Sequence, residues 1–200
     1  MRQRISLPGS YPFRGIALRG MDPLMYRFVA DQQRAVLGVG ALEESEEPRF
    51  DAAGRVTDWW FGHLGYGYKD RLEDVRSRSA DAFDWPLSYW FRPKWVVEWS
   101  KAGTFLHVHE ADRAEALAWT QKLVAPSAET TGVNAMEWLC SIPRSQYLTG
   151  ASQLLKRIQR GDIYEVNYCI AHEAMQEGFD PYRAFDVLLS ETQAPFAGFM

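Results

Sequence analysis

The stretch KWVVEWSKAGTFLHVHE, Lys94–Glu110, contains two runs of alternating residues separated by a short polar segment. Side chains two residues apart lie on the same face of a strand, so Trp95, Val97 and Trp99 are predicted to share one face. The polar segment Ser100–Gly103 suits a tight turn. The stretch therefore predicts a β-hairpin, which favours a fold built on antiparallel sheets.

Further strand signals precede this hairpin. Two apolar runs surround the polar residues Asp31–Arg34, which predicts a second hairpin within Met21–Ala41. The charged segment Glu43–Arg55 is predicted to be an exposed connector. The following stretch, VTDWWFGHLGYGYKD at Val56–Asp70, predicts a strand whose glycines indicate close backbone packing.

Helical spacing begins after the hairpin. The stretch ADRAEALAWTQKLVAP, Ala111–Pro126, predicts a helix that ends at its proline. The side chains predicted near its inward face are Ala114, Leu117, Ala118 and Trp119.

Two more helices are expected in the last third of the chain. The stretch SQYLTGASQLLKRIQRG predicts a helix with Ser145 as N-cap and Gly161 as C-cap. Asp180 and Pro181 form an N-cap and N1 pair that opens the other helix. The inward side chains predicted for this last helix are Tyr182, Phe185, Leu188 and Leu189. Hairpins followed by helices predict an α+β fold, with mostly antiparallel sheets packed face to face and helices outside.

The composition indicates a globular protein without a nucleic-acid or membrane partner. The 200 residues are 46% hydrophobic and carry a formal net charge of -4, so no overall field attracts nucleic acid. No apolar run approaches the ~18 residues of a transmembrane helix, and the amino terminus lacks the features of a signal peptide. A cytoplasmic location is therefore predicted, with Cys140 and Cys169 as buried thiols.

Two side-chain groups suggest sites but have simpler interpretations. His107 and His109 are two residues apart on one strand, yet two ligands do not complete a zinc site, so packed or exposed histidines are preferred. Six of the eight tryptophans lie between Trp59 and Trp99, interleaved with acidic as often as basic residues, which favours an aromatic core over a base-stacking surface. No arrangement of serine, histidine and aspartate supports nucleophilic hydrolysis.

The stretch RGDIYEVNYCIAH, Arg160–His172, places a carboxylate and an amide on one face of a predicted strand. Glu165 and Asn167 are two residues apart, so their side chains are expected to point the same way. Such a face is either solvated or the wall of a binding site, and spacing alone favours the solvated face.

The same region resembles a known enzyme family. The stretch YLTGASQLLKRIQRGDIYEVNYCIAH, followed by DPYRAFDVLLSETQAPFAGFM, is similar to the opening of the chorismate-binding domain of aminodeoxychorismate synthase and anthranilate synthase large subunits. The matching residues are Gly161, Asp162, Ile163, Tyr164, Val166, Ala194, Pro195 and Phe196. The stretch WWFGHLGYGYKDRLED and the later WFRPKWVV resemble the preceding amino-terminal domain more loosely.

The resemblance implies a domain order and a site. Residues 1–144 would form the amino-terminal domain, and residues 145–200 would begin the chorismate-binding domain of a chain that continues further. Asn at the position of Asn167 is typical of aminodeoxychorismate synthases, which implies that it faces the chorismate pocket. Glu165 departs from the commoner Gln of the family. The tryptophan-sensing Leu-Glu-Ser motif has no convincing match, since ALEES at Ala41–Ser45 falls in the connector.

The resemblance also implies partners and chemistry. Chorismate would be aminated with ammonia from a glutamine amidotransferase subunit, with Mg²⁺ held by residues that lie outside this chain. The fold implied is a four-layer arrangement whose sheets pack nearly orthogonally. The 200-residue chain alone is expected to be inactive. The alternatives are anthranilate synthase and a non-catalytic interaction module.

Overall fold

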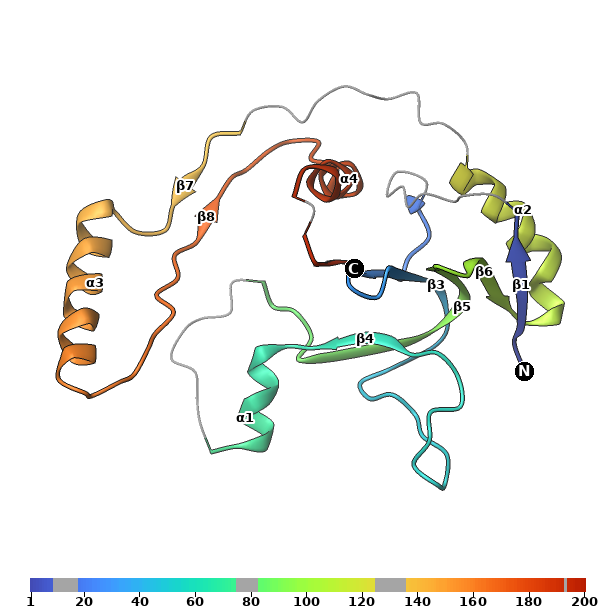
Figure 1. Cartoon of the computed structure of the whole chain (residues 1–200), viewed down its shortest axis with the longest axis horizontal. Helices are drawn as coiled ribbons and strands as arrows, with labels where there is room; N and C mark the ends of the chain where they lie inside the picture. The colour runs from blue at the N-terminus through green and yellow to red at the C-terminus, as the bar shows by residue number, and fades with distance from the viewer. Residues whose placement is uncertain (9–17, 75–82, 125–135, 193) are drawn as a thin grey trace. The chain divides into compact units, whose positions relative to one another are not determined.

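The chain forms two compact units. The computed structural model describes residues 1–8, 18–74, 83–124, 136–192 and 194–200 (Figure 1). Unit 1 comprises Met1–Thr130 and Pro181–Met200, and unit 2 comprises Thr131–Asp180. The domain boundary expected between residues 144 and 145 concerns family segments rather than spatial units, so it stays a prediction.

Unit 1 is built on a seven-stranded sheet in which every pair of neighbours is antiparallel. The strand order is β1-β6-β5-β3-β2-β9, and β4 pairs with β5 beside this path. The strands are β1 Gln3–Leu7, β2 Leu24–Val29, β3 Arg34–Ser45, β4 Phe61–Leu64, β5 Ser88–Ser100, β6 Gly103–Val108 and β9 Phe196–Phe199. The α+β class with antiparallel strands is therefore confirmed.

Both predicted hairpins are confirmed. The β2–β3 pair turns at residues 30–33, and the β5–β6 pair turns at residues 101–102. Val97 lies opposite Leu106 in the second hairpin, and both side chains are fully buried. The alternation that predicted the hairpin thus also identified its core face.

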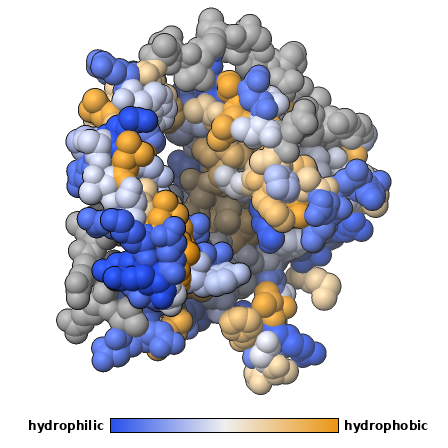
Figure 2. All heavy atoms as spheres, turned by 60° about the vertical axis from the view of Figure 1, so that its left-hand side comes forward, coloured by the Kyte–Doolittle hydropathy of each residue, from blue (hydrophilic) through white to orange (hydrophobic). Residues whose placement is uncertain are grey.

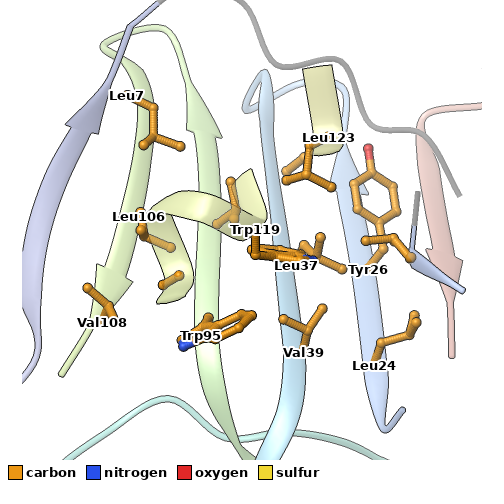
Figure 3. Close-up of a cluster of buried hydrophobic side chains, with 14 residues drawn as sticks. Leu7, Leu24, Tyr26, Leu37, Val39, Trp95, Leu106, Val108, Trp119 and Leu123 are labelled. Carbon is orange, nitrogen blue, oxygen red and sulfur yellow. The ribbon is translucent and has the colours of Figure 1, made fainter. Parts of the chain in front are cut away.

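The helix α2, Arg113–Val124, covers this core face, as Figure 3 shows with Trp119 beside the sheet side chains. The indole rings of Trp119 and Trp95 lie 5.1 Å apart between centroids. The predicted inward face was partly wrong, because Ala114 and Ala118 are exposed. The buried residues of the helix are Ala116, Trp119, Thr120 and Leu123.

The buried positions of α2 follow the i, i+3, i+4, i+7 spacing of a helix that lies on a flat sheet. The hydroxyl of Thr120 donates a hydrogen bond of 2.8 Å to the carbonyl oxygen of Leu117, so this buried polar group has a partner. A threonine could therefore occupy a core position that the hydrophobic pattern did not indicate. The predicted end at Pro126 lies outside the described residues.

The helix α4, Pro181–Thr192, packs on the same core. It begins at Pro181, as predicted, and the ring of Phe185 meets the ring of Tyr26 edge-on at 6.0 Å. Tyr182 and Leu189 also contact this core, whereas Leu188 is exposed, so that part of the prediction was wrong. The strand β9 follows and pairs with β2, which ties the last residues of unit 1 to its centre.

Aromatic residues contribute to both faces of the sheet. Phe61 and Phe91 are buried on the face opposite α2, with Trp59 partly buried against them. Trp95 is buried on the α2 side, which confirms the predicted aromatic core for this residue, and Trp119 of α2 packs against it. Trp85 is exposed and does not belong to that core.

The connector after β3 contains a local turn. One carboxylate oxygen of Asp51 accepts hydrogen bonds of 2.9 Å from the backbone N–H groups of Ala53 and Arg55. These bonds lower the pKa of Asp51 and stabilise a turn that lets Phe50 form an isolated bridge with Val56. The rest of unit 1 adds η2 Tyr66–Tyr68, α1 Lys69–Leu72 and η3 Glu110–Asp112.

Unit 2 contains one long helix and a minimal sheet. The helix α3 spans Arg144–Gln159, and the strands β7 Leu139–Cys140 and β8 His172–Glu173 pair antiparallel. Among the described residues of the whole chain, no helix is long and apolar enough to cross a bilayer.

Candidate functional site

The candidate site lies in unit 2, where α3 is followed by the segment that contains Asn167. The helix ends in a Schellman motif, because the N–H of Gly161 bonds to the carbonyl of Ile158 at 2.9 Å and the N–H of Asp162 bonds to that of Arg157 at 3.0 Å. Gly161 has φ +79°, a conformation that costs glycine little. The predicted role of Gly161 at the helix end is confirmed.

The start of α3 differs from the prediction. The helix begins at Arg144 after Pro143, whose extended backbone occupies the N-cap position without a side-chain cap. Ser145 therefore lies inside the first turn, and its predicted role as N-cap was wrong. The observed N-cap thus lies two residues before Ser145, and Pro143, whose φ is -61°, has no backbone N–H that needs a partner.

The segment 163–171 is not a strand. No described strand pairs with it, and only His172 and Glu173 at its end join a sheet. The predicted strand was therefore wrong in this structure, because alternation identifies a backbone that can pair but cannot supply the partner. Its last part is held near the two-stranded sheet by the N–H of Ser141, which donates to the carbonyl of Ala171 at 2.8 Å.

A tyrosine joins this segment to α3. The ring of Tyr168 stacks on the ring of Tyr147, with centroids 5.0 Å apart and planes at 7°. Gly150 permits this close approach, since a Cβ atom there would lie 2.4 Å from the hydroxyl oxygen of Tyr168. The segment therefore follows one side of the helix at a fixed position.

Asn167 precedes this tyrosine and is exposed, as is Glu165. Its carboxamide offers two N–H donors and one carbonyl acceptor to whatever approaches from solvent. The polar groups are therefore available, which both a solvated face and a binding wall require. The role of Asn167 stays a prediction.

A shallow hollow of about 470 Å³ lies on the Tyr168 side of α3. Its polar lining comes from the side chains of Ser145, Gln146, Thr149 and Gln153, together with the Tyr168 hydroxyl. Asn167 is not part of this lining, although it is adjacent in sequence to Tyr168. The hollow thus presents uncharged hydrogen-bonding side chains that could bind hydroxyl or carboxylate oxygens.

Comparison with known proteins assigns the family. A sequence model of chorismate-binding enzymes matches residues 21–200, which include both α3 and the segment of Asn167. The chain belongs to the chorismate-binding enzyme family. The resemblance noted in the sequence of Tyr147–Met200 is therefore confirmed at the level of the family.

One known protein is similar over much of the chain. Aminodeoxychorismate synthase component 1 from Klebsiella aerogenes is 27% identical over 150 residues. The aligned region covers 70% of this chain and 31% of that protein, so the chain spans less than a third of its relative. The likeness supports membership of the family and leaves the reaction to be proposed.

The two cysteines of the present chain are not buried as the sequence analysis expected. Cys140 and Cys169 are both free and both exposed, so their predicted burial was wrong. Cys140 is in the two-residue strand β7, which has no layer packed over it among the described residues of unit 2. A hydrophobic side chain is buried only where a second layer covers it, which no local pattern reveals.

His107 and His109 are packed or partly exposed, as the sequence analysis expected. The Nε2 atom of His107 lies 2.9 Å from a carboxylate oxygen of Glu98, and its ring lies 5.3 Å from the ring of Trp59. Burial alone would raise the pKa of Glu98, but the hydrogen bond with His107 and the charge of Arg34 outweigh it and hold this pKa below its usual value. Among the described residues, no three carboxylate, histidine or cysteine side chains are grouped to hold a metal ion. The Mg²⁺ that the resemblance implies stays a prediction.

The sequence reasoning missed one charged cluster altogether. Arg2, Asp58 and Arg92 meet in unit 1, although 56 and 34 residues separate the first and last of them from Asp58. A lone arginine next to the amino terminus and a lone aspartate before two tryptophans carry no local signal of pairing. Only the sheet brings them together.

Proposed function

We propose that the chain acts as part of the large subunit of an aminodeoxychorismate synthase, which aminates chorismate to 4-amino-4-deoxychorismate for para-aminobenzoate and folate synthesis. The observation that carries the proposal is the 27% identity over 150 residues to aminodeoxychorismate synthase component 1. Membership of the chorismate-binding enzyme family supports chorismate as the substrate.

Asn167 is proposed to face the bound chorismate. Its carboxamide can donate a hydrogen bond to the departing ring hydroxyl and accept one from an incoming amine. The exposure of this side chain supports the proposal, because a buried and fully bonded amide would have no capacity for a ligand. The stacked Tyr147 and Tyr168 would hold the segment in position against α3.

The proposal includes two components outside this chain. Mg²⁺ would bind carboxylates that the chain does not contain, and ammonia would come from a glutamine amidotransferase subunit in the cytoplasm. The described residues fit no metal site, so no catalytic step is assigned here to the ion. The chain by itself is therefore proposed to be inactive.

Exposed apolar residues support a packing of further polypeptide on unit 2. None of the residues of α3 is buried, and Leu155, Tyr164 and Val166 are exposed. In Figure 2, the side of the molecule on which Figure 1 shows α3 is turned toward the viewer. Hydrophobic side chains lie at the surface on this side. A polypeptide layer over unit 2 would cover such residues. In the complete subunit we propose two sheets packed face to face and nearly orthogonal.

Product analysis tests the reaction. The subunit that contains this chain is incubated with chorismate, Mg²⁺ and ammonium, and the products are separated by chromatography. We expect 4-amino-4-deoxychorismate and no anthranilate. Anthranilate formed without an added lyase would replace the proposal by an anthranilate synthase, and the absence of any product would favour a non-catalytic interaction module.

Substitution of Asn167 tests the site. In that subunit, Asn167→Ala is expected to lower kcat/KM for chorismate by roughly ten- to a hundredfold, because it removes a hydrogen bond to a polar group of the substrate. Thermal stability should change little, since Asn167 is exposed. Steady-state kinetics measures this effect. Ammonium supplies the nitrogen in place of the amidotransferase, so that the partner subunit does not influence the result.

A matched control is Gln159→Ala, which removes another exposed amide of unit 2 at the end of α3. This variant should keep kcat/KM within about twofold, as surface substitutions away from a site usually do. If Asn167→Ala behaves like Gln159→Ala, the polar face is ordinary surface and the site assignment is withdrawn.

A further inference from the structure

A cavity of about 750 Å³ opens in unit 1 and is lined by charged and aromatic side chains. His107 lies in its wall, and its strand neighbours Leu106 and Val108 point into the core beneath α2. Because side chains alternate along a strand, the cavity lies on the face of the sheet opposite α2. The lining residues that matter are Arg2, Asp58, Trp59, Trp60, Arg92 and His107.

An arginine fixes one wall of this cavity. The side chain of Arg2 is only 7% exposed, and its Nε atom donates to a carboxylate oxygen of Asp58 at 2.6 Å. Its two terminal nitrogens donate to the carbonyl oxygens of Lys94 and Pro93 in β5. The guanidinium thus holds the Asp58 loop against the sheet, and the wall is formed before any ligand arrives.

The carboxylate of Asp58 is already engaged. Besides Arg2, it accepts the backbone N–H of Trp59 at 2.8 Å. Burial alone would raise the pKa of Asp58, but the hydrogen bonds from Arg2 and Trp59 outweigh it and hold this pKa below its usual value. Asp58 therefore stays ionised and has little remaining capacity for a ligand cation.

Arg92 differs from Arg2 because its ion pairs are long. Its Nε atom lies 3.4 Å from Glu43, and its Nη1 atom lies 3.5 Å from Asp58, with the side chain 30% exposed. Strong bonds between a guanidinium and a carboxylate are about 2.7–2.9 Å long. Arg92 therefore retains donors for an anion that enters the cavity.

The remaining walls offer flat aromatic surface. Trp59 and Trp60, which are consecutive in the sequence, both line the cavity. The ring centroids of His107 and Trp59 are 5.3 Å apart, and the ring planes form an angle of 58°. Aromatic faces bind other planar rings in offset or edge-on arrangements. A planar ligand that carries a negative charge matches both features of the cavity.

We propose that this cavity binds a small planar aromatic monocarboxylate, with its carboxylate on the Arg92 guanidinium and its ring against Trp59 and Trp60. A guanidinium binds a carboxylate with two parallel hydrogen bonds, which fixes the plane of the ligand. A phosphate dianion would place more negative charge beside Asp58, and an amino acid would bring an ammonium group for which no carboxylate is free in this wall. The proposal does not depend on chorismate chemistry.

The test is a titration of the 200-residue chain with benzoate. Two-dimensional ¹H–¹⁵N NMR spectra recorded at each benzoate concentration monitor the binding. The indole N–H signals of the two lining tryptophans report on the site and are assigned with the variants Trp59→Phe and Trp60→Phe. We expect saturable shifts of these signals with a Kd in the millimolar range, which suits a ligand as small as benzoate. Benzamide, cyclohexanecarboxylate, phenylalanine and inorganic phosphate are titrated in parallel and should each bind at least about fivefold more weakly.

Arg92→Gln removes the proposed anion contact and is expected to weaken benzoate binding by about tenfold or more. The matched control is Arg71→Gln, because Arg71 also forms a long ion pair, 3.4 Å from Glu46, and does not line the cavity. Trp60→Leu provides an independent variant that leaves the charges intact and should weaken binding several-fold. Signal dispersion in the spectra verifies that each variant is folded.

Four results would overturn the proposal. Equal benzoate affinities for Arg92→Gln and Arg71→Gln would remove Arg92 from the site. If benzamide bound as tightly as benzoate, the cavity would not recognise the negative charge. If cyclohexanecarboxylate bound as tightly as benzoate, it would not recognise a planar ring. Phosphate binding more tightly than benzoate would make this an anion site without an aromatic partner.

Discussion

Replacing Gly62 by alanine is expected to lower the free energy of unfolding of unit 1 by about 2–3 kcal/mol. A Cβ atom at this position would lie 2.1 Å from the carbonyl oxygen of Tyr89 and 2.7 Å from the Cα atom of Trp90. Both are backbone atoms of β5, so neither can move aside like a flexible side chain. The strand β4 must then separate from β5, which opens the aromatic cluster around Phe61.

Urea denaturation, monitored by tryptophan fluorescence, measures the free energy of unfolding. The fluorescence reports mainly on unit 1, because seven of the eight tryptophans lie there. The control is Gly65→Ala, where the new Cβ atom would meet its nearest neighbour, the carbonyl oxygen of Leu87, at an ordinary 3.5 Å. This variant should stay within about 1 kcal/mol of the original protein. Similar losses for both variants would show that general glycine replacement, not the close approach at Gly62, causes the effect.

The second large effect is expected for Arg2→Met, which should destabilise unit 1 by about 2–3 kcal/mol. The substitution keeps much of the side-chain length but leaves the carboxylate of Asp58, 15% exposed, without its closest cationic partner. It also removes the donors to two carbonyl oxygens of β5. Partial exposure of Asp58 places the loss below that of a fully buried pair.

Arg55→Met provides the comparison, because Arg55 pairs with Asp51 at 3.0 Å while its side chain is 77% exposed. An exposed pair contributes about 0–1 kcal/mol, so this variant should be nearly neutral. Adding Asp58→Asn to Arg2→Met should recover part of the lost stability, since the unpaired charge is then gone. If the double variant is no more stable than Arg2→Met, the loss comes from packing or from the carbonyl bonds and not from the isolated carboxylate.

Local patterns in the sequence were sufficient for most of the regular structure. The alternation around Trp95 predicted the β5–β6 hairpin and its buried face, because side chains two residues apart on a strand share one face. The Asp180–Pro181 pair predicted the start of α4, and Gly161 predicted the end of α3. The motif from Gly161 to Val166, followed by Ala194–Phe196, also identified the chorismate-binding enzyme family.

Wherever a prediction required knowledge of a neighbouring layer, the tertiary structure gave the answer. Thr120 is buried although it is polar, because its hydroxyl bonds to the preceding turn, and Cys140 is exposed although it is apolar, because no described layer covers it. The segment 163–171 alternates like a strand but has no paired neighbour among the described residues. The contact between Arg2 and Asp58 bridges 56 residues, and such a pair becomes visible only when the sheet brings two distant backbones together. Periodicity reports which face of an element is apolar, while pairing, burial and charge contacts depend on what the rest of the chain places against that face.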